Sequence, residues 1–199
     1  MLSTNRQVFI YDDDSTWVDM AHVQNIDDFK KSYTHIRGYH ACRTMDVNSY
    51  LQNGIKPATR DNILELGKQL FGNYSSGKEL AAAFDALRGP HVWKSIGVVW
   101  FELHKQNLIS GNEQYRLEGS GLIGRMAGIL KLENPFVNHG TPMIFSVDIP
   151  IELIPAVYIA KIITYVYNMQ PESGKCQSNL PVSVKNTILP QFIVSYEKA

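Results

Sequence analysis

Residues 34–57 read THIRGYHACRTMDVNSYLQNGIKP, and the fold class follows from the patterns in and around this stretch. Its first seven residues alternate weakly between apolar and polar side chains, which predicts a strand that ends at His40 in a polar site. Asp46–Gln52 follows as a short helix, and Asn53-Gly54 is a typical helix stop because glycine adopts left-handed backbone conformations at low cost. The stretch therefore predicts a strand, a short helix and a turn that redirects the chain.

The segments that follow alternate between helical and strand patterns. Apolar residues at helical spacing predict helices over 60–71, 77–87, 119–132 and 151–169. Runs rich in β-branched and aromatic residues predict strands over 95–103, 142–149, 180–186 and 190–196. This order predicts an α+β fold with a mixed or antiparallel sheet and flanking helices. Since the sequence contains no repeat or linker tract, we expect a single domain over 1–199, with 1–34 as an N-terminal extension.

Composition and charge exclude several classes of protein. Lys plus Arg number 19 and Asp plus Glu number 19, so no net positive field drives binding to nucleic acid, although a nucleic-acid substrate remains possible. Cys42 and Cys176 are the only cysteines and form no CxxC or Cys/His cluster, so we expect neither a disulfide scaffold nor a metal site. The acidic N-terminus and the interrupted apolar stretch at 149–169 predict a cytoplasmic protein without a membrane segment.

The stretch YHACRTMDVNSYLQNGIKP resembles the first motif of the ADP-ribosyltransferase superfamily, in its diphtheria-toxin and poly-ADP-ribose-polymerase branch. There a strand ends in His-Gly-Ser/Thr-Arg, a short helix follows, and Asn/Gln-Gly-Leu/Ile completes the unit. The resemblance implies that His40 hydrogen-bonds the adenine-side ribose hydroxyls of NAD, that Ala41 lets the ligand approach the backbone, and that Arg43 supports the loop or a phosphate. Ala41 and Cys42 replace the usual Gly-Ser/Thr. The residues alone favour the alternative, a capped or core histidine.

A second set of residues resembles the middle motif of the family, which is a Gly-Ile-Tyr-Phe strand, a second tyrosine and a helix that begins with serine. Here Gly97–Glu102 is the strand, Tyr115 the second aromatic residue and Ser120 the serine. The resemblance implies that Trp100 and Tyr115 enclose the nicotinamide ring and that Ser120 holds its carboxamide. Trp100 replaces the strand tyrosine, which makes Tyr115 the better candidate for stacking. The alternatives are a core tryptophan, a surface tyrosine and a simple helix N-cap.

The third segment, NTILPQFIVSY at 186–196, resembles the final motif of the polymerase branch, in which a catalytic glutamate precedes the chain end. Gln191 stands where that glutamate is expected. A carboxylate bonded to the ribose 2-hydroxyl stabilises the oxocarbenium-like transition state, and a neutral glutamine loses the charge-assisted part of that bond. Glu118 and Glu197 are spare carboxylates, and the two-residue period of a strand would put Glu197 on the same face as Gln191.

The resemblance implies a mono-ADP-ribosyltransferase that consumes NAD as a substrate, needs no metal and modifies a protein, DNA or RNA acceptor. His40, Tyr115 and Gln191 would form its catalytic set. Small bacterial or phage-defence members of the superfamily act as toxins, so an antitoxin or regulatory protein is a further expected partner. Two alternatives stay open. One is a degenerate module that binds NAD, ADP-ribose or a protein, and the other is an NAD-dependent RNA 2′-phosphotransferase, whose basic site the scattered Arg37, Arg43 and Arg60 do not establish.

Overall fold

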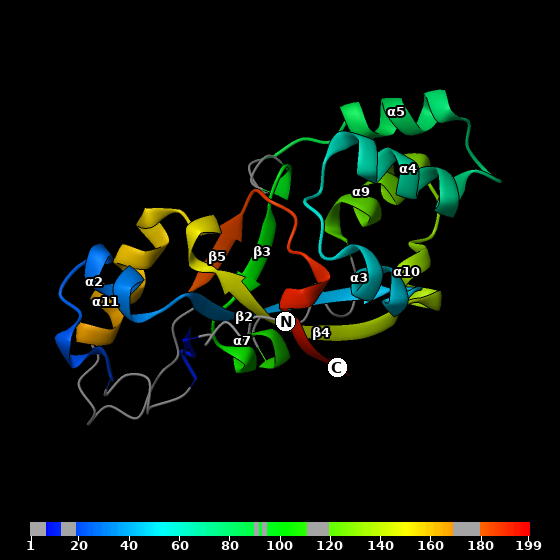
Figure 1. The fold of residues 1–199 in the computed structure, drawn as a ribbon. Coiled ribbons are helices and arrows are strands. Elements are labelled where there is room, and N and C mark those ends of the chain that lie inside the picture. The colour runs from blue at the N-terminus through cyan, green and yellow to red at the C-terminus, as the bar shows by residue number, and fades with distance from the viewer. Residues whose placement is uncertain (1–6, 13–18, 90–91, 93–94, 111–119, 169–179) are drawn as a thin grey trace.

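The computed structural model describes residues 7–12, 19–89, 92, 95–110, 120–168 and 180–199, and a single sheet runs through its centre (Figure 1). In chain order the elements are β1 (Val8–Phe9), η1 (Asp19–His22), α2 (Ile26–Ser32), β2 (His35–Thr44), α3 (Val47–Asn53), α4 (Arg60–Phe71), α5 (Gly77–Asp85), β3 (Val99–Glu102), α7 (Lys105–Ser110), α9 (Gly121–Leu130), α10 (Pro135–His139), β4 (Thr141–Pro150), η2 (Ile151–Leu153), α11 (Ala156–Asn168), β5 (Pro181–Val184), η4 (Pro190–Phe192) and β6 (Ile193–Lys198).

The sheet has six strands in the order β5-β3-β2-β4-β6, with β1 beside β2 off this path. β1 runs parallel to β2, and the other neighbouring pairs are antiparallel. The predicted α+β class with a mixed sheet is therefore confirmed. β2 and β4 pair along their whole length, from His35↔Pro150 to Thr44↔Thr141, and they form the frame to which the other strands attach.

The predicted end of the first long strand at His40 is wrong. β2 continues to Thr44 because Cys42 and Thr44 pair with Met143 and Thr141 of β4. This pairing satisfies the backbone of both strands, and Cys42 and Met143 are buried beside each other. His40 consequently lies in the interior of a strand, and its surroundings are set by neighbouring strands.

The core consists of two main hydrophobic clusters. The larger one covers the sheet with residues from α2 and α11, and the fully buried Phe9 and Phe29 belong to it. β1 and α2 are thus part of the main core. The smaller cluster joins α4, α5 and α9 through residues such as Leu80, Ile123 and Met126. Figure 1 shows these three helices grouped at one end of the molecule and α2 with α11 at the other.

Local signals explain the helix boundaries next to β2. The Asp46 side chain accepts a hydrogen bond from the backbone N–H of Asn48 at 2.9 Å, which caps α3. α3 ends at Gly54, whose φ of +76° is in the region that favours glycine. A Cβ atom on Gly54 would lie 2.0 Å from the Ile188 carbonyl oxygen, so glycine also permits the close approach of the two backbones.

The predicted C-terminal strand at 190–196 is wrong at its beginning. Pro190–Phe192 forms the 3-10 turn η4, and β6 begins at Ile193. Proline has no N–H for a strand ladder and favours the first position of a helical turn, so Pro190 explains the difference. Gln191 therefore lies on a turn. No helix in the described part of the chain has the length and apolarity to cross a bilayer.

Candidate functional site

His40 lies at the point where β2 and β3 separate. The two strands pair at Tyr39↔Glu102. The His40 Nδ1 atom is 2.9 Å from the carbonyl oxygen of Trp100, and the imidazole ring centre lies 5.7 Å from that of Phe101. The histidine therefore bridges β2 and β3 and has a fixed orientation.

This geometry defines the chemistry of His40. A carbonyl oxygen only accepts hydrogen bonds, so Nδ1 carries the proton and donates it to Trp100. Burial lowers the pKa of His40, and the bond to the Trp100 carbonyl opposes this shift only in part, so the imidazole is neutral at pH 7. Nε2 is then an acceptor. Within the described residues Nε2 has no hydrogen-bond partner, and it can accept a bond from a hydroxyl group.

Ala41 and Arg43 project from the opposite face of β2, because side chains alternate along a strand. Ala41 is buried against Leu108 and Ile144. The Arg43 Nη2 atom donates to the Val137 carbonyl oxygen at 3.1 Å. Arg43 therefore supports the segment around α10. The structure does not place it beside His40, and this leaves its proposed contact with a phosphate without geometric support.

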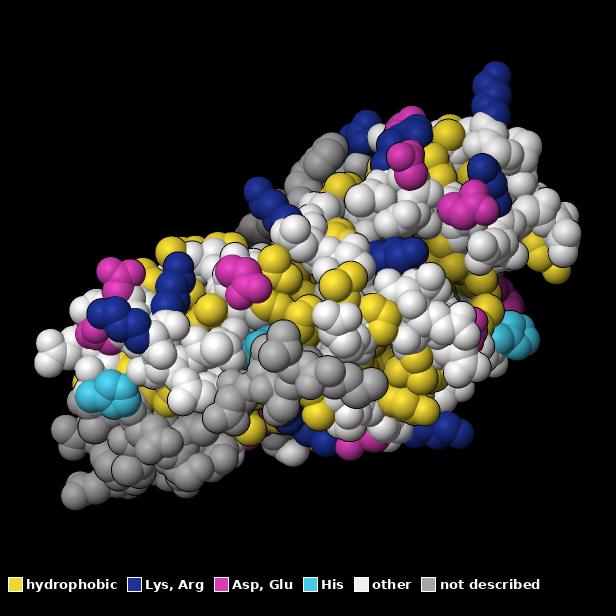
Figure 2. Space-filling model, viewed as in Figure 1, with side chains coloured by type: hydrophobic (Ala, Val, Ile, Leu, Met, Phe, Trp, Pro, Cys, Tyr) yellow, Lys and Arg dark blue, Asp and Glu magenta, His cyan; other side chains and the backbone are white. Residues whose placement is uncertain are grey.

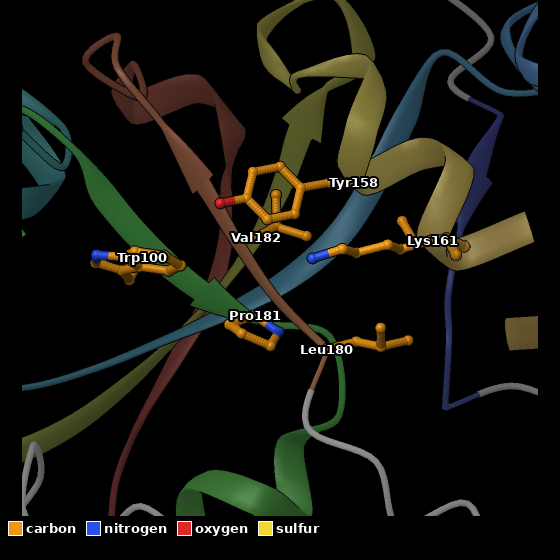
Figure 3. A pocket seen from close by; sticks show the side chains of 7 residues that line it. Trp100, Tyr158, Lys161, Leu180, Pro181 and Val182 are labelled. Carbon is orange, nitrogen blue, oxygen red and sulfur yellow. The ribbon is translucent and has the colours of Figure 1, made fainter. Parts of the chain in front are cut away.

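Trp100 lines a cavity of about 180 Å³ between β3, β5 and α11 (Figure 3). The lining residues are Trp100, Tyr158, Lys161, Ile162, Leu180, Pro181 and Val182. β3 lies between β2 and β5 in the sheet, so the cavity and His40 are on opposite sides of β3. No sequence pattern connects Tyr158 and Lys161 with Trp100, because only the fold brings the helix at 156–168 to this strand.

Of Tyr115 and Ser120 in the middle motif, the structure describes only Ser120. Tyr115 and its loop lie outside the described residues. Ser120 occupies the N-cap position of α9 without a side-chain capping bond. The buried face of α9 packs with α4 and α5 in the smaller hydrophobic cluster, whereas Phe101 beside His40 belongs to the larger one. The structure thus places Ser120 on a different part of the core from the His40 surroundings.

The first and third motifs meet in space. The N–H of Ile55 donates to the Ile188 carbonyl oxygen at 2.9 Å, and the N–H of Ile188 donates back to Ile55 at 3.0 Å. η4 packs against α3 and β4, and the ring of Phe192 lies 5.5 Å from the ring of His35. Gln191 is exposed within this joined region. No family model, curated protein or solved structure matches the chain. Its function is therefore inferred from contacts within the structure, such as those between the first and third motifs.

Of the two spare carboxylates, the structure describes Glu197. Glu197 lies on β6 and forms an ion pair with Lys105 Nζ at 2.8 Å. The proposed sharing of a strand face with Gln191 is wrong, since Gln191 precedes the strand. Glu118 lies outside the described residues. Glu102 is a buried carboxylate that sequence analysis missed, and burial raises its pKa to about 7. Its signal in the sequence is a charge inside the apolar run at 95–103.

The three arginines considered for a basic site each contact a different element. Arg37 Nε lies 2.5 Å from Asp148 Oδ1, and Arg60 Nη2 lies 3.1 Å from Asp85 Oδ1. Positive and negative side chains are interspersed on the face that Figure 2 shows. Among residues 7–12, 19–89, 92, 95–110, 120–168 and 180–199, no group of three or more His, Cys, Asp or Glu side chains is arranged to hold a metal ion.

Proposed function

We propose that this chain transfers one ADP-ribose unit from NAD to a macromolecular acceptor. The observation that carries the proposal is the state of His40, a neutral imidazole held by the Trp100 carbonyl with Nε2 as a hydrogen-bond acceptor. A ribose hydroxyl of NAD donates to Nε2, which orients the sugar beside β2. This role is the one that the resemblance implies for His40.

Two features of the backbone support the proposal. β2 pairs with β3 at one register position and with β4 at ten, so the contact between β2 and β3 beside His40 is short, as expected for a split sheet of the ADP-ribosyltransferase type. The bridge between Ile55 and Ile188 joins the turn of the first motif to the last motif. Both motifs then border the same part of the sheet, next to the strand that carries His40.

The reaction breaks the bond between ribose C1′ and the nicotinamide nitrogen. The electron pair of this bond leaves with nicotinamide, which becomes neutral, and the sugar passes through an oxocarbenium-like state. A nucleophile on the acceptor forms the new bond to C1′ and loses its proton to solvent or a nearby base. Gln191 holds a ribose hydroxyl without a charge, which favours slow transfer of a single unit over chain elongation.

Restoring the carboxylate tests this assignment of Gln191. The expected result is that Gln191→Glu transfers ADP-ribose about tenfold faster than the natural chain, because a charge-assisted hydrogen bond is roughly twice as strong as a neutral one. The measurement uses NAD labelled in its adenylate phosphate, incubated with purified protein and a cell lysate. Protease and nuclease digestion then identify the labelled acceptor.

Gln106→Glu is the matched control for this experiment, because Gln106 is exposed on α7 and the substitution adds the same charge elsewhere. Its rate should equal that of the natural chain. If all label stays in free NAD with every variant, transfer is excluded. If both substitutions change the rate equally, Gln191 has no special position.

A second candidate function is binding of NAD or ADP-ribose without transfer. It is favoured by the neutral Gln191 and by the ion pair that engages Glu197 with Lys105. The two functions differ in one product, because only transfer or hydrolysis releases nicotinamide. NAD binding without nicotinamide release in the presence of lysate would support the binding module.

A further inference from the structure

The cavity between β3, β5 and α11 has features of a binding site that is separate from His40. It lies on the β5 side of β3, whereas His40 approaches β3 from the β2 side. Its volume is about 180 Å³. Pockets for drug-sized ligands measure roughly 300–1,000 Å³, so this cavity suits one ring system and is too small for a dinucleotide.

The walls of the cavity are aromatic and apolar. Trp100 from β3 and Tyr158 from α11 border it from two sides, with Pro181 and Val182 of β5 between them (Figure 3). The Tyr158 hydroxyl forms a hydrogen bond with the Ser183 hydroxyl at 2.9 Å, which fixes the orientation of the ring. Such walls favour a flat aromatic ligand, because aromatic rings stack on each other and on proline or aliphatic surfaces.

The cavity also has a positive charge at its mouth. Lys161 extends from α11 toward the space between Tyr158 and Pro181 (Figure 3), and its Nζ lies 5.7 Å from the centre of the Tyr158 ring. In the described part of the chain, no carboxylate lies within ion-pair distance of Lys161. The ammonium group is therefore available for an anion supplied by a ligand.

We infer that this cavity binds a small aromatic acid, meaning a single planar ring system that carries a carboxylate or a phosphate. The ring lies among Trp100, Tyr158 and Pro181, and the anionic group contacts Lys161. Each part of the ligand thus matches one part of the cavity. The inference does not depend on the proposed transfer of ADP-ribose, because the two sites share only Trp100, through its carbonyl oxygen at His40 and its ring at the cavity.

Calorimetric titration with charged and neutral ligand pairs tests the inference. Phenyl phosphate and indole-3-carboxylate represent the phosphate and carboxylate sources, and phenol and indole are their uncharged counterparts. At least one acid should bind, and Lys161→Gln should weaken its binding about tenfold, since an ion pair across the mouth of the cavity is lost. Lys185→Gln, which removes an exposed lysine just after β5, should leave binding unchanged.

A second variant tests the aromatic wall without changing the charge. Tyr158→Leu should weaken binding of the same acid, and thermal unfolding checks that the variant keeps its fold. The inference is overturned if neither acid binds at millimolar concentration, if the neutral counterpart binds as tightly as its acid, or if Lys161→Gln and Lys185→Gln have equal effects. The acid that binds shows whether the natural ligand carries a phosphate or a carboxylate. NAD turnover should not change in Lys161→Gln. Failure of the aromatic acid to bind the cavity is therefore distinguishable from failure of the transferase proposal.

Discussion

Gly54→Ala is expected to lower the free energy of unfolding by about 3 kcal/mol, the largest effect of any single methyl addition that we predict. The added Cβ would lie 2.0 Å from the Ile188 carbonyl oxygen, and an alanine at φ +76° is strained even without this contact. Relief of the clash requires the turn at 53–55 to move away from Ile188. The bridge that joins the first and third motifs would then open.

Urea denaturation of Gly54→Ala and of Gly77→Ala measures this effect. Gly77 is the matched control, because it is exposed at the start of α5 and an added Cβ there meets no atom within 4 Å. Alanine at that position should change stability by less than about 1 kcal/mol, in the stabilising direction. Equal stability of the two variants would contradict the close pairing of Gly54 with Ile188.

Arg37→Ala is expected to lower the free energy of unfolding by about 3 kcal/mol, because it leaves the Asp148 carboxylate buried without its counter-charge. The Arg37 Nε atom lies 2.5 Å from Asp148 Oδ1, and the two side chains are 20% and 7% exposed. The pair also links opposite positions on β2 and β4. Its loss therefore weakens the central ladder of the sheet.

Arg60→Ala is the control for that effect. Arg60 donates to both carboxylate oxygens of Asp85, but the side chains of this pair are 46% and 59% exposed. Exposed pairs contribute about 0–1 kcal/mol, so this variant should be nearly as stable as the natural chain. Thermal or urea unfolding of Arg37→Ala and Arg60→Ala measures the loss of stability in each variant. A cost at Arg60 as large as that at Arg37 would show that burial does not govern these pairs.

Most elements of the fold could be predicted from local patterns. α4 covers the predicted range 60–71, and Ser76 and Glu79 form a capping box at the start of α5. The failures have non-local causes. β2 continues past His40 because β4 pairs with it, and no residue within 34–44 encodes this partner. The turn at Pro190 could have been predicted, because proline disfavours an interior strand position. The apolar run after it led instead to the prediction of a strand over 190–196.

The candidate site was less predictable than the fold. The motif at 39–57 points to His40, but the bond of His40 to the Trp100 carbonyl depends on how β2 and β3 pair. Trp100 was assigned to the same ligand as His40, whereas the sheet order puts its cavity on the other side of β3. Lys161 gave no signal, because a lysine on an amphipathic helix ordinarily faces solvent. Its importance arises only when α11 packs beside β5.

Calorimetric titration of NAD into the natural chain, His40→Ala and His139→Ala tests the central claim most directly. His139 is an exposed histidine on α10 and serves as the control. Loss of the Nε2 acceptor should weaken NAD binding about tenfold in His40→Ala, while His139→Ala binds as the natural chain does. Since burial lowers the pKa of His40, binding to the natural chain should persist as the pH falls to 6.5, the ordinary pKa of histidine, and weaken only below it. Absence of NAD binding by the natural chain, or equal binding by folded His40→Ala, would contradict the assignment of His40 to NAD.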